Sequence, residues 1–217
     1  GQGAHAAKIV VTGNPVRPAV IAASEIPYDS ARAGGPFRLL VFGGSQGARV
    51  MSDIVPGAIE KLEPALRRRL VLTQQVRDED MARVRALYDR LEIEAELAPF
   101  FADLPARLAS SHIVVSRSGA GTVAELGAIG RPSVLVPLPG AIDQDQFANA
   151  GVLADAGGAI RIVQPDFTPD RLAAELSALA ADPARLAAMA TAARAVGRLD
   201  AAGRLADLVM RVARTGA

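Results

Sequence analysis

Residues 38–47 read Arg-Leu-Leu-Val-Phe-Gly-Gly-Ser-Gln-Gly, and this stretch decides the fold. Its first half is almost continuously apolar, which is typical of a strand buried on both faces of a parallel sheet. A helix is predicted to begin near Arg49, so the glycines form the turn between strand and helix. Such a turn directs free backbone N–H groups and the positive end of the helix dipole toward an anion. We predict a phosphate-binding turn; the alternative is that any tight strand-to-helix turn needs glycine for steric reasons.

The same alternation of strand and helix continues along the chain. Apolar, often β-branched runs predict strands at residues 8–12, 38–42, 70–73, 93–97, 112–116, 133–137 and 159–163. Helical periodicity predicts helices at residues 49–62, 78–91, 104–109, 122–129, 145–156, 168–180, 183–196 and 200–213. Residues 16–36 lack periodicity and are expected to be a connector. This order predicts an α/β fold, a Rossmann-like parallel sheet with helices on both faces.

Composition limits the possible functions. The 217 residues are half apolar, which is enough to bury one substantial core. The 24 basic and 23 acidic residues leave no net field to hold a polyanion, so we expect no nucleic-acid partner. The absence of cysteine excludes disulfides, thiolate zinc sites and a cysteine nucleophile. No apolar run approaches the ~20 residues of a membrane helix, and no signal peptide is recognisable, so we expect neither a transmembrane segment nor export.

A second glycine turn follows the strand predicted at residues 112–116. Residues 116–122 read Ser-Arg-Ser-Gly-Ala-Gly-Thr. Because the carboxyl ends of parallel strands meet at one edge of a sheet, the two turns together suit the two ends of a nucleoside diphosphate. Thr122 and Glu125 have the spacing of a capping box, which we favour over the alternative that Glu125 accepts hydrogen bonds from a ribose diol. Neither turn matches a P-loop or a dinucleotide fingerprint, so a kinase or dehydrogenase is disfavoured.

The last helix carries an apolar stripe at the end of an otherwise complete domain. The stripe comprises Leu199, Leu205, Leu208, Val209 and Val212. We expect this helix to pack back on the same sheet; the alternative is that it needs a partner surface. The expected division is therefore residues 1–7 as a leader or vector-derived remnant, residues 8–198 as the Rossmann-like domain, and residues 199–217 as the terminal helix.

Five motifs in order resemble the MurG family of N-acetylglucosaminyltransferases. They are Gly-Asn-Pro-Val-Arg at 13–17, Gly-Gly-Ser-Gln-Gly-Ala at 43–48, Pro-Phe-Phe-Ala-Asp-Leu at 99–104, Ser-Arg-Ser-Gly-Ala-Gly-Thr-Val-Ala-Glu-Leu at 116–126, and Pro-Leu-Pro at 137–139 followed by Asn-Ala at 149–150. The resemblance implies the C-terminal, nucleotide-sugar-binding half of a GT-B fold. It implies UDP-N-acetylglucosamine as donor, no cofactor, and a peripheral location on the cytoplasmic face of the bacterial inner membrane for the parent enzyme. We expect the N-terminal acceptor domain, which takes the lipid-linked muramyl pentapeptide, to be missing.

The resemblance also implies a set of substrate-binding residues. It assigns the uracil to Phe101 with Phe100 beside it, the ribose to Glu125 in place of the capping role, and the sugar hydroxyls to Gln146 and Asn149. The diphosphate is assigned to Arg17, Ser45 and the backbone of Ala120, Gly121 and Thr122, and Gly44, Gln46, Ser118 and Asp145 complete the set. Two departures are visible: Asp145 replaces a His or Gln, and Gln-Gln-Val-Arg at 74–77 replaces a His-Gln-Thr-Gly run, in which Gln75 keeps the glutamine.

The implied reaction is an inverting transfer to an acceptor hydroxyl, which needs a general base. His5 lies in the expected leader and His112 opens a core strand, so we expect the base in the missing domain and donor binding without turnover in this chain. The sequence Asp-Gln-Asp at 143–145 resembles a DxD metal motif, but its loop belongs to the wrong architecture and we predict no metal site. Alternatives are a UDP-N-acetylglucosamine 2-epimerase-like domain and a non-catalytic nucleotide-sugar-binding module.

Overall fold

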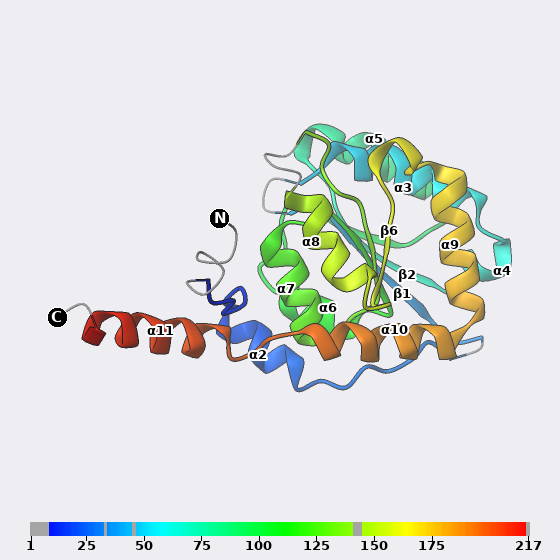
Figure 1. The fold of residues 1–217 in the computed structure, drawn as a ribbon. Helices are drawn as coiled ribbons and strands as arrows, with labels where there is room; N and C mark the ends of the chain where they lie inside the picture. Colours follow the sequence, from blue (N-terminus) through cyan, green and yellow to red (C-terminus); the bar gives the residue numbers. More distant parts are fainter. Residues whose placement is uncertain (1–8, 33, 45–46, 141–144, 216–217) are drawn as a thin grey trace.

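The computed structural model describes residues 9–32, 34–44, 47–140 and 145–215. These residues form one six-stranded sheet in the order β3-β2-β1-β4-β5-β6, with every neighbouring pair parallel (Figure 1). The strands are β1 (Phe37–Phe42), β2 (Leu70–Gln75), β3 (Ala95–Ala98), β4 (Ile113–Ser116), β5 (Ser133–Leu135) and β6 (Ala159–Arg161). The expected Rossmann-like parallel sheet is confirmed.

Helices connect the strands. They are α2 (Pro18–Ser24), α3 (Arg49–Lys61), α4 (Pro64–Arg67), α5 (Asp78–Arg90), α6 (Leu104–Ser110), α7 (Ala120–Ile129), α8 (Asp145–Ala154), α9 (Pro169–Ala181), α10 (Pro183–Val196) and α11 (Ala201–Thr215), with the 3₁₀ turn η2 (Gln164–Asp166). From β1 the chain builds the sheet outward through β2 to β3, and then returns to start the other half at β4. Strand order therefore reverses between β1 and β4, whose carboxyl ends are where ligands of open α/β sheets bind.

Alternate residues of β1 serve two separate cores. Leu39 and Val41 are buried with side chains of α3, α5 and α9, whereas Leu40 and Phe42 are buried with those of α2, α6 and α7. Successive side chains of a strand point to opposite faces, so an unbroken apolar run is what a sheet covered on both faces requires. Packing in these two cores fixes the positions of the carboxyl ends of β1 and β4, and therefore of the two glycine turns that follow them.

Several expected elements differ from the structure. The described residues 9–12 form no strand, and Ile9 and Val11 are largely exposed, so the strand predicted at 8–12 is wrong. The predicted connector contains α2, a seven-residue helix with proline at its first position and Val20 buried in the core. The short elements α4 and η2 were not predicted, and β5 and β6 are each two residues shorter than predicted.

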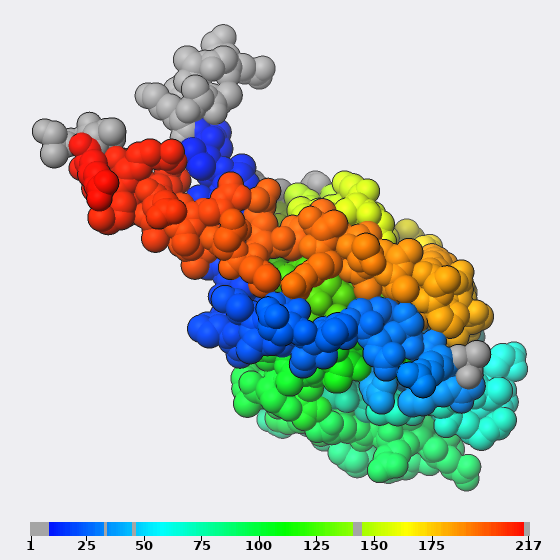
Figure 2. Space-filling model, turned by 90° about the horizontal axis from the view of Figure 1, so that it is seen from below, coloured from blue at the N-terminus to red at the C-terminus, as the bar shows by residue number. Residues whose placement is uncertain are grey.

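Helix α11 extends away from the body of the molecule, beside the segment that precedes α2 (Figures 1 and 2). Ala201 is buried, but Leu205, Val209 and Met210 are 42–58% exposed. A hydrogen bond from Arg204 Nη2 to the carbonyl of Val11 (3.1 Å) joins the helix to that segment. The expectation that this helix packs back on the sheet is wrong. No described helix is both long and apolar enough to span a membrane.

Candidate functional site

The first glycine turn follows β1, and its backbone requires glycine at positions 43, 44 and 47. A Cβ on Gly43 would lie 2.2 Å from the backbone nitrogen of Ala48, and Gly44 and Gly47 have φ angles of +98° and +69°. The Gly47 N–H donates to the carbonyl of Gly44 (3.1 Å) and closes the turn. Folding alone therefore requires these glycines. Ser45 and Gln46, two of the expected site residues, lie outside the described residues.

The side chain of Gln75, the last residue of β2, is hydrogen-bonded to this turn. Its Oε1 accepts a hydrogen bond from the Gly43 N–H (2.9 Å), and its Nε2 donates to the carbonyl of Pro99 (3.0 Å). The side chain is buried and its amide joins the glycine turn to the segment that carries Phe100 and Phe101. The sequence predicted only that Gln75 keeps a family glutamine. A polar residue ending a buried strand was the signal for its position at the site.

The second glycine turn leads directly into α7. Gly119 is the N-cap residue and Ala120 the first helical residue, two positions earlier than predicted. No side chain caps this end, so the predicted capping box of Thr122 and Glu125 is wrong. The first N–H groups of the helix have no acceptor within it. A Cβ on Gly119 or Gly121 would meet nothing within 4 Å, so this backbone borders open space.

Glu125 instead pairs with Arg17, which lies 108 residues away in the sequence. The Arg17 Nε and Nη2 donate to Oε1 and Oε2 of the carboxylate at 3.0 and 3.1 Å. The Glu125 side chain is 13% exposed and that of Arg17 is 56% exposed. A carboxylate has about four lone-pair positions, and this fork uses two of them, so Glu125 retains acceptor capacity for hydroxyl donors. Two expected site residues are thus brought into direct contact.

Two adjoining hollows run over the carboxyl edge of the sheet. One, of about 310 Å³, is lined by residues that include Arg17, Gln75, Phe100, Phe101 and Glu125. The other, of about 930 Å³, is lined by residues that include Gly43, Gly47, Arg49, Arg117 and Gln146. Gly44, Gly121 and Thr122 line both, so the hollows form one continuous groove. We call it the carboxyl-edge groove.

Aromatic side chains form one end of this groove. Phe101 is buried, with the guanidinium of Arg107 4.4 Å from its ring centre, whereas Phe100 is 64% exposed. The two expected uracil neighbours therefore differ: one is fixed in the structure and the other faces solvent.

The expected contacts to the sugar are only partly brought together. Ser118 is buried and its hydroxyl donates to the carbonyl of Gln146 (2.7 Å), while the Gln146 Oε1 accepts from the Leu138 N–H (3.1 Å). Asp145 accepts from the backbone N–H of Gln146 (2.7 Å) and is exposed. Asn149 lines a separate hollow of about 380 Å³, which Ala120 also lines. Four of the expected residues thus hold or border the start of α8 and lie apart from the Glu125 end.

Arg117 is a feature that the sequence did not assign. Its side chain is buried in the wall of the groove, and its guanidinium donates to the carbonyls of Val136 (3.2 Å) and Pro137 (3.0 Å) and to Oε1 of Gln164 (2.6 Å). Burial lowers the pKa of Arg117 from its ordinary value, yet arginine remains protonated in proteins. No carboxylate among the described residues pairs with it, so its positive charge contributes to the potential of the groove.

His112 has a structural role, as expected. It is buried, stacks on Phe37, and accepts a hydrogen bond from the Arg38 N–H through Nδ1 (2.9 Å). Burial lowers the pKa of His112, and the nearby Arg38 guanidinium lowers it further. Among the described residues, no three His, Cys, Asp or Glu side chains group as a metal ion would require.

The chain matches the family model described as glycosyltransferase family 28 C-terminal domain over residues 38–205. It is 84% identical over 212 residues to the UDP-N-acetylglucosamine--N-acetylmuramyl-(pentapeptide) pyrophosphoryl-undecaprenol N-acetylglucosamine transferase of Nitrobacter winogradskyi, a match that covers 98% of this chain and 58% of that relative. A relative of the same name from Rhodopseudomonas palustris is 77% identical over 209 residues, covering 96% of this chain and 57% of its own length. The chain thus spans less than two thirds of these relatives.

Solved structures show the same likeness. The MurG crystal structure from Acinetobacter baumannii superimposes with a TM-score of 0.75 at 30% identity, covering 88% of this chain and 53% of that chain. The UDP co-structure of MnaA from S. aureus gives a TM-score of 0.67 at 15% identity, covering 98% of this chain and 57% of that one, which is a likeness of fold alone.

Proposed function

Because the chain belongs to the glycosyltransferase family 28 C-terminal domain family, we propose that it is the donor-binding half of an inverting GT-B enzyme. The donor is UDP-N-acetylglucosamine, and the acceptor is a hydroxyl of lipid-linked N-acetylmuramyl pentapeptide. The observation that carries this proposal is the carboxyl-edge groove, where a carboxylate with free acceptor capacity lies beside two helix starts suited to an anion.

The nucleotide is proposed to lie along the groove. The uracil rests between the backbone at Phe101 and the exposed ring of Phe100, and the ribose diol donates to Glu125. The diphosphate then lies over Gly44 and the first turn of α7, where backbone N–H groups point outward. The sugar extends toward Gln146, whose backbone Ser118 holds in place. This assignment is supported by the residues shared between the two hollows.

The proposed chemistry requires stabilisation of a leaving diphosphate. Negative charge accumulates on UDP as the glycosidic bond breaks, and donors that are already oriented stabilise that charge most in the transition state. The start of α7, the glycine turn and the buried cation of Arg117 supply such donors and charge. The general base that accepts the proton of the acceptor hydroxyl is proposed to lie in the part of the relatives that this chain does not span. We further propose that the whole enzyme works at the cytoplasmic face of the inner membrane, where its lipid-linked acceptor is accessible.

Calorimetric titration of UDP and UDP-N-acetylglucosamine tests the site. We expect saturable binding of both, and Glu125→Ala is expected to weaken binding of each at least about tenfold, because the ribose hydroxyls lose a charged acceptor. A matched control is Glu175→Ala, which removes a carboxylate paired with Arg171 on α9, away from the groove. Equal affinities for the parent and Glu125→Ala would contradict the assignment, and absence of UDP binding by the parent would contradict the proposed function.

A further inference from the structure

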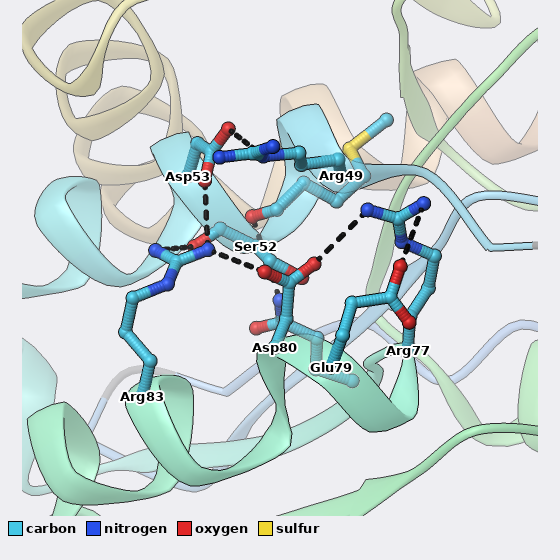
Figure 3. Close-up of polar contacts among 9 residues, drawn as sticks. Arg49, Ser52, Asp53, Arg77, Glu79, Asp80 and Arg83 are labelled. Atoms are coloured by element: carbon cyan, nitrogen blue, oxygen red, sulfur yellow. Dashed lines mark hydrogen bonds and ion pairs between the residues drawn. The ribbon is translucent and has the colours of Figure 1, made fainter.

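The buried carboxylate of Asp80 lies between the guanidinium groups of Arg77 and Arg83 (Figure 3). Asp80, in the first turn of α5, is 6% exposed. Its Oδ1 accepts a hydrogen bond from Arg83 Nη2 at 2.8 Å, and its Oδ2 accepts from Arg77 Nη2 at 3.4 Å. These hydrogen bonds hold the pKa of Asp80 below its ordinary value, with the bond from Arg83 as the largest cause.

One of the arginines touches the glycine turn itself. A Cβ added to Gly47 would lie 2.8 Å from Cγ of Arg77, so the arginine stem forms the wall against which the end of the turn rests. The head of Arg77 is held by Asp80 and by Glu79 (3.1 Å), and its Nε is buried without a partner among the described residues. The position of this wall therefore depends on two carboxylates of α5.

The other arginine reaches α3, the helix that follows the turn. Arg83 donates to the carbonyl of Ser52 (3.3 Å) and to Oδ1 of Asp53 (2.7 Å), and Asp53 also pairs with Arg49 (3.5 Å). Arg49 and Asp53 line the carboxyl-edge groove. Ion pairs and hydrogen bonds therefore link Arg49, at the groove, through Asp53, Arg83 and Asp80 to Arg77. The stem of Arg77 in turn lies against Gly47, which also lines the groove.

We propose that Asp80 is a positioning residue for the diphosphate: through Arg77 and Arg83 it fixes the end of the glycine turn relative to the first turns of α3. This inference rests on the proposed function. A buried carboxylate is costly in free energy unless it is paired. Conformations in which Arg77 or Arg83 leaves Asp80 are therefore disfavoured, and both arginines stay in their observed places. A hydrogen-bonding site depends on the exact placement of its donors, and a small displacement of the turn weakens contacts to the diphosphate while leaving the nucleoside end unchanged.

The test compares two ligands on one variant. Asp80→Asn keeps the side-chain shape and removes the charge that holds both arginines. We expect the Kd of UDP, measured by calorimetry, to rise about tenfold, and the Kd of uridine, measured by NMR titration, to stay within about twofold of the parent value. Asp182→Asn is the matched control: this residue caps α10 through the Arg185 N–H (2.9 Å), away from the groove, and both ligands should bind as in the parent.

A second variant, Arg77→Met, provides the same test if Asp80→Asn does not fold. Arg77→Met retains a stem that packs against Gly47 and loses only the charged head, and it should weaken UDP selectively as Asp80→Asn does. Equal weakening of UDP and uridine in the folded variants would reduce Asp80 to a purely structural role and overturn the inference, as would unchanged affinity for both. If the parent bound uridine but not UDP, the proposed function itself would fail, which separates the two conclusions.

Discussion

The two glycine turns at the carboxyl edge have similar sequences but opposite physical requirements. In the turn after β1, a methyl group on Gly43 or Gly47 would collide with backbone or with the stem of Arg77. In the turn after β4, a methyl group on Gly119 or Gly121 would meet nothing within 4 Å. The first set of glycines is needed so that the chain can fold, and the second set leaves space where a ligand can approach the backbone.

The turns are also supported differently. The first turn is fixed by residues of other segments: Gln75 accepts a hydrogen bond from Gly43, and Arg77, paired with Asp80, packs against Gly47. The second is followed at once by α7, and its side chains Arg117 and Ser118 support neighbouring loops. A glycine-rich motif therefore does not say by itself whether glycine serves the fold or the ligand; only the surroundings of each Cβ position distinguish the two.

The largest effect that tests this comparison is expected from Gly43→Ala. The added methyl group would lie 2.2 Å from the Ala48 nitrogen, and backbone cannot move aside cheaply, so we expect a loss of at least about 3 kcal/mol in the free energy of unfolding. For a domain of this size the Tm should fall by about 6–12 °C. Gly203→Ala in α11, where a Cβ meets nothing within 4 Å, serves as control and should not lower the Tm. If Gly43→Ala and Gly203→Ala had the same Tm, the fold would not require glycine at position 43, and the proposed difference between the two turns would be contradicted.

A smaller effect, in binding and not in stability, is expected from Gly121→Ala. Alanine is favourable at this second position of α7, so the free energy of unfolding should stay constant or rise by up to about 1 kcal/mol. The methyl group would project into the part of the groove common to both hollows, and UDP affinity measured by calorimetry should fall about tenfold. If UDP bound as tightly as to the parent, the open space at this turn would have no role for the ligand.

The fold was largely predictable from the sequence because buried parallel strands are continuous apolar runs. The runs that became β1 and β4 were found for this reason, and the glycine turns followed from their ends. The run at residues 8–12 looks similar, but periodicity does not reveal whether a strand has a free sheet edge to pair with, and Ile9 remains exposed. Helix α2 was missed because seven residues carry too little periodicity.

The site was predicted in its parts but not in its connections. Family motifs indicated Arg17 and Glu125 separately, and their pairing across 108 residues depends on where α2 meets α7. The role of Gln75 was not predictable from spacing, because its partners Gly43 and Pro99 follow other strands. Asp80 pairs with Arg77 and Arg83 at helical spacing, but the contacts of these arginines with Gly47 and with α3 depend on how the elements pack. The exposed stripe of α11 was visible as an apolar pattern, yet pattern alone does not state which surface covers a helix.

The smallest expected effect concerns the opposite ends of the strands that carry both turns. At these ends the His112 Nδ1 accepts from the Arg38 N–H, which requires the imidazole to be neutral at that nitrogen. Because the pKa of His112 is lowered in the folded state, the unfolded chain binds the proton first as pH falls below about 6.5. Stability therefore decreases with falling pH, by at most about 1 kcal/mol between pH 7 and pH 5.5.

Denaturant unfolding of the parent and of His112→Asn across this pH range measures the effect. Asparagine offers an oxygen acceptor that does not titrate, so the variant should lack the part of the pH slope that His112 contributes, whatever its stability at pH 7. If the two proteins had the same slope, protonation of His112 would not be coupled to unfolding. A slope in the parent that the variant lacks would mean that a neutral imidazole joins β1 and the start of β4 in the folded protein.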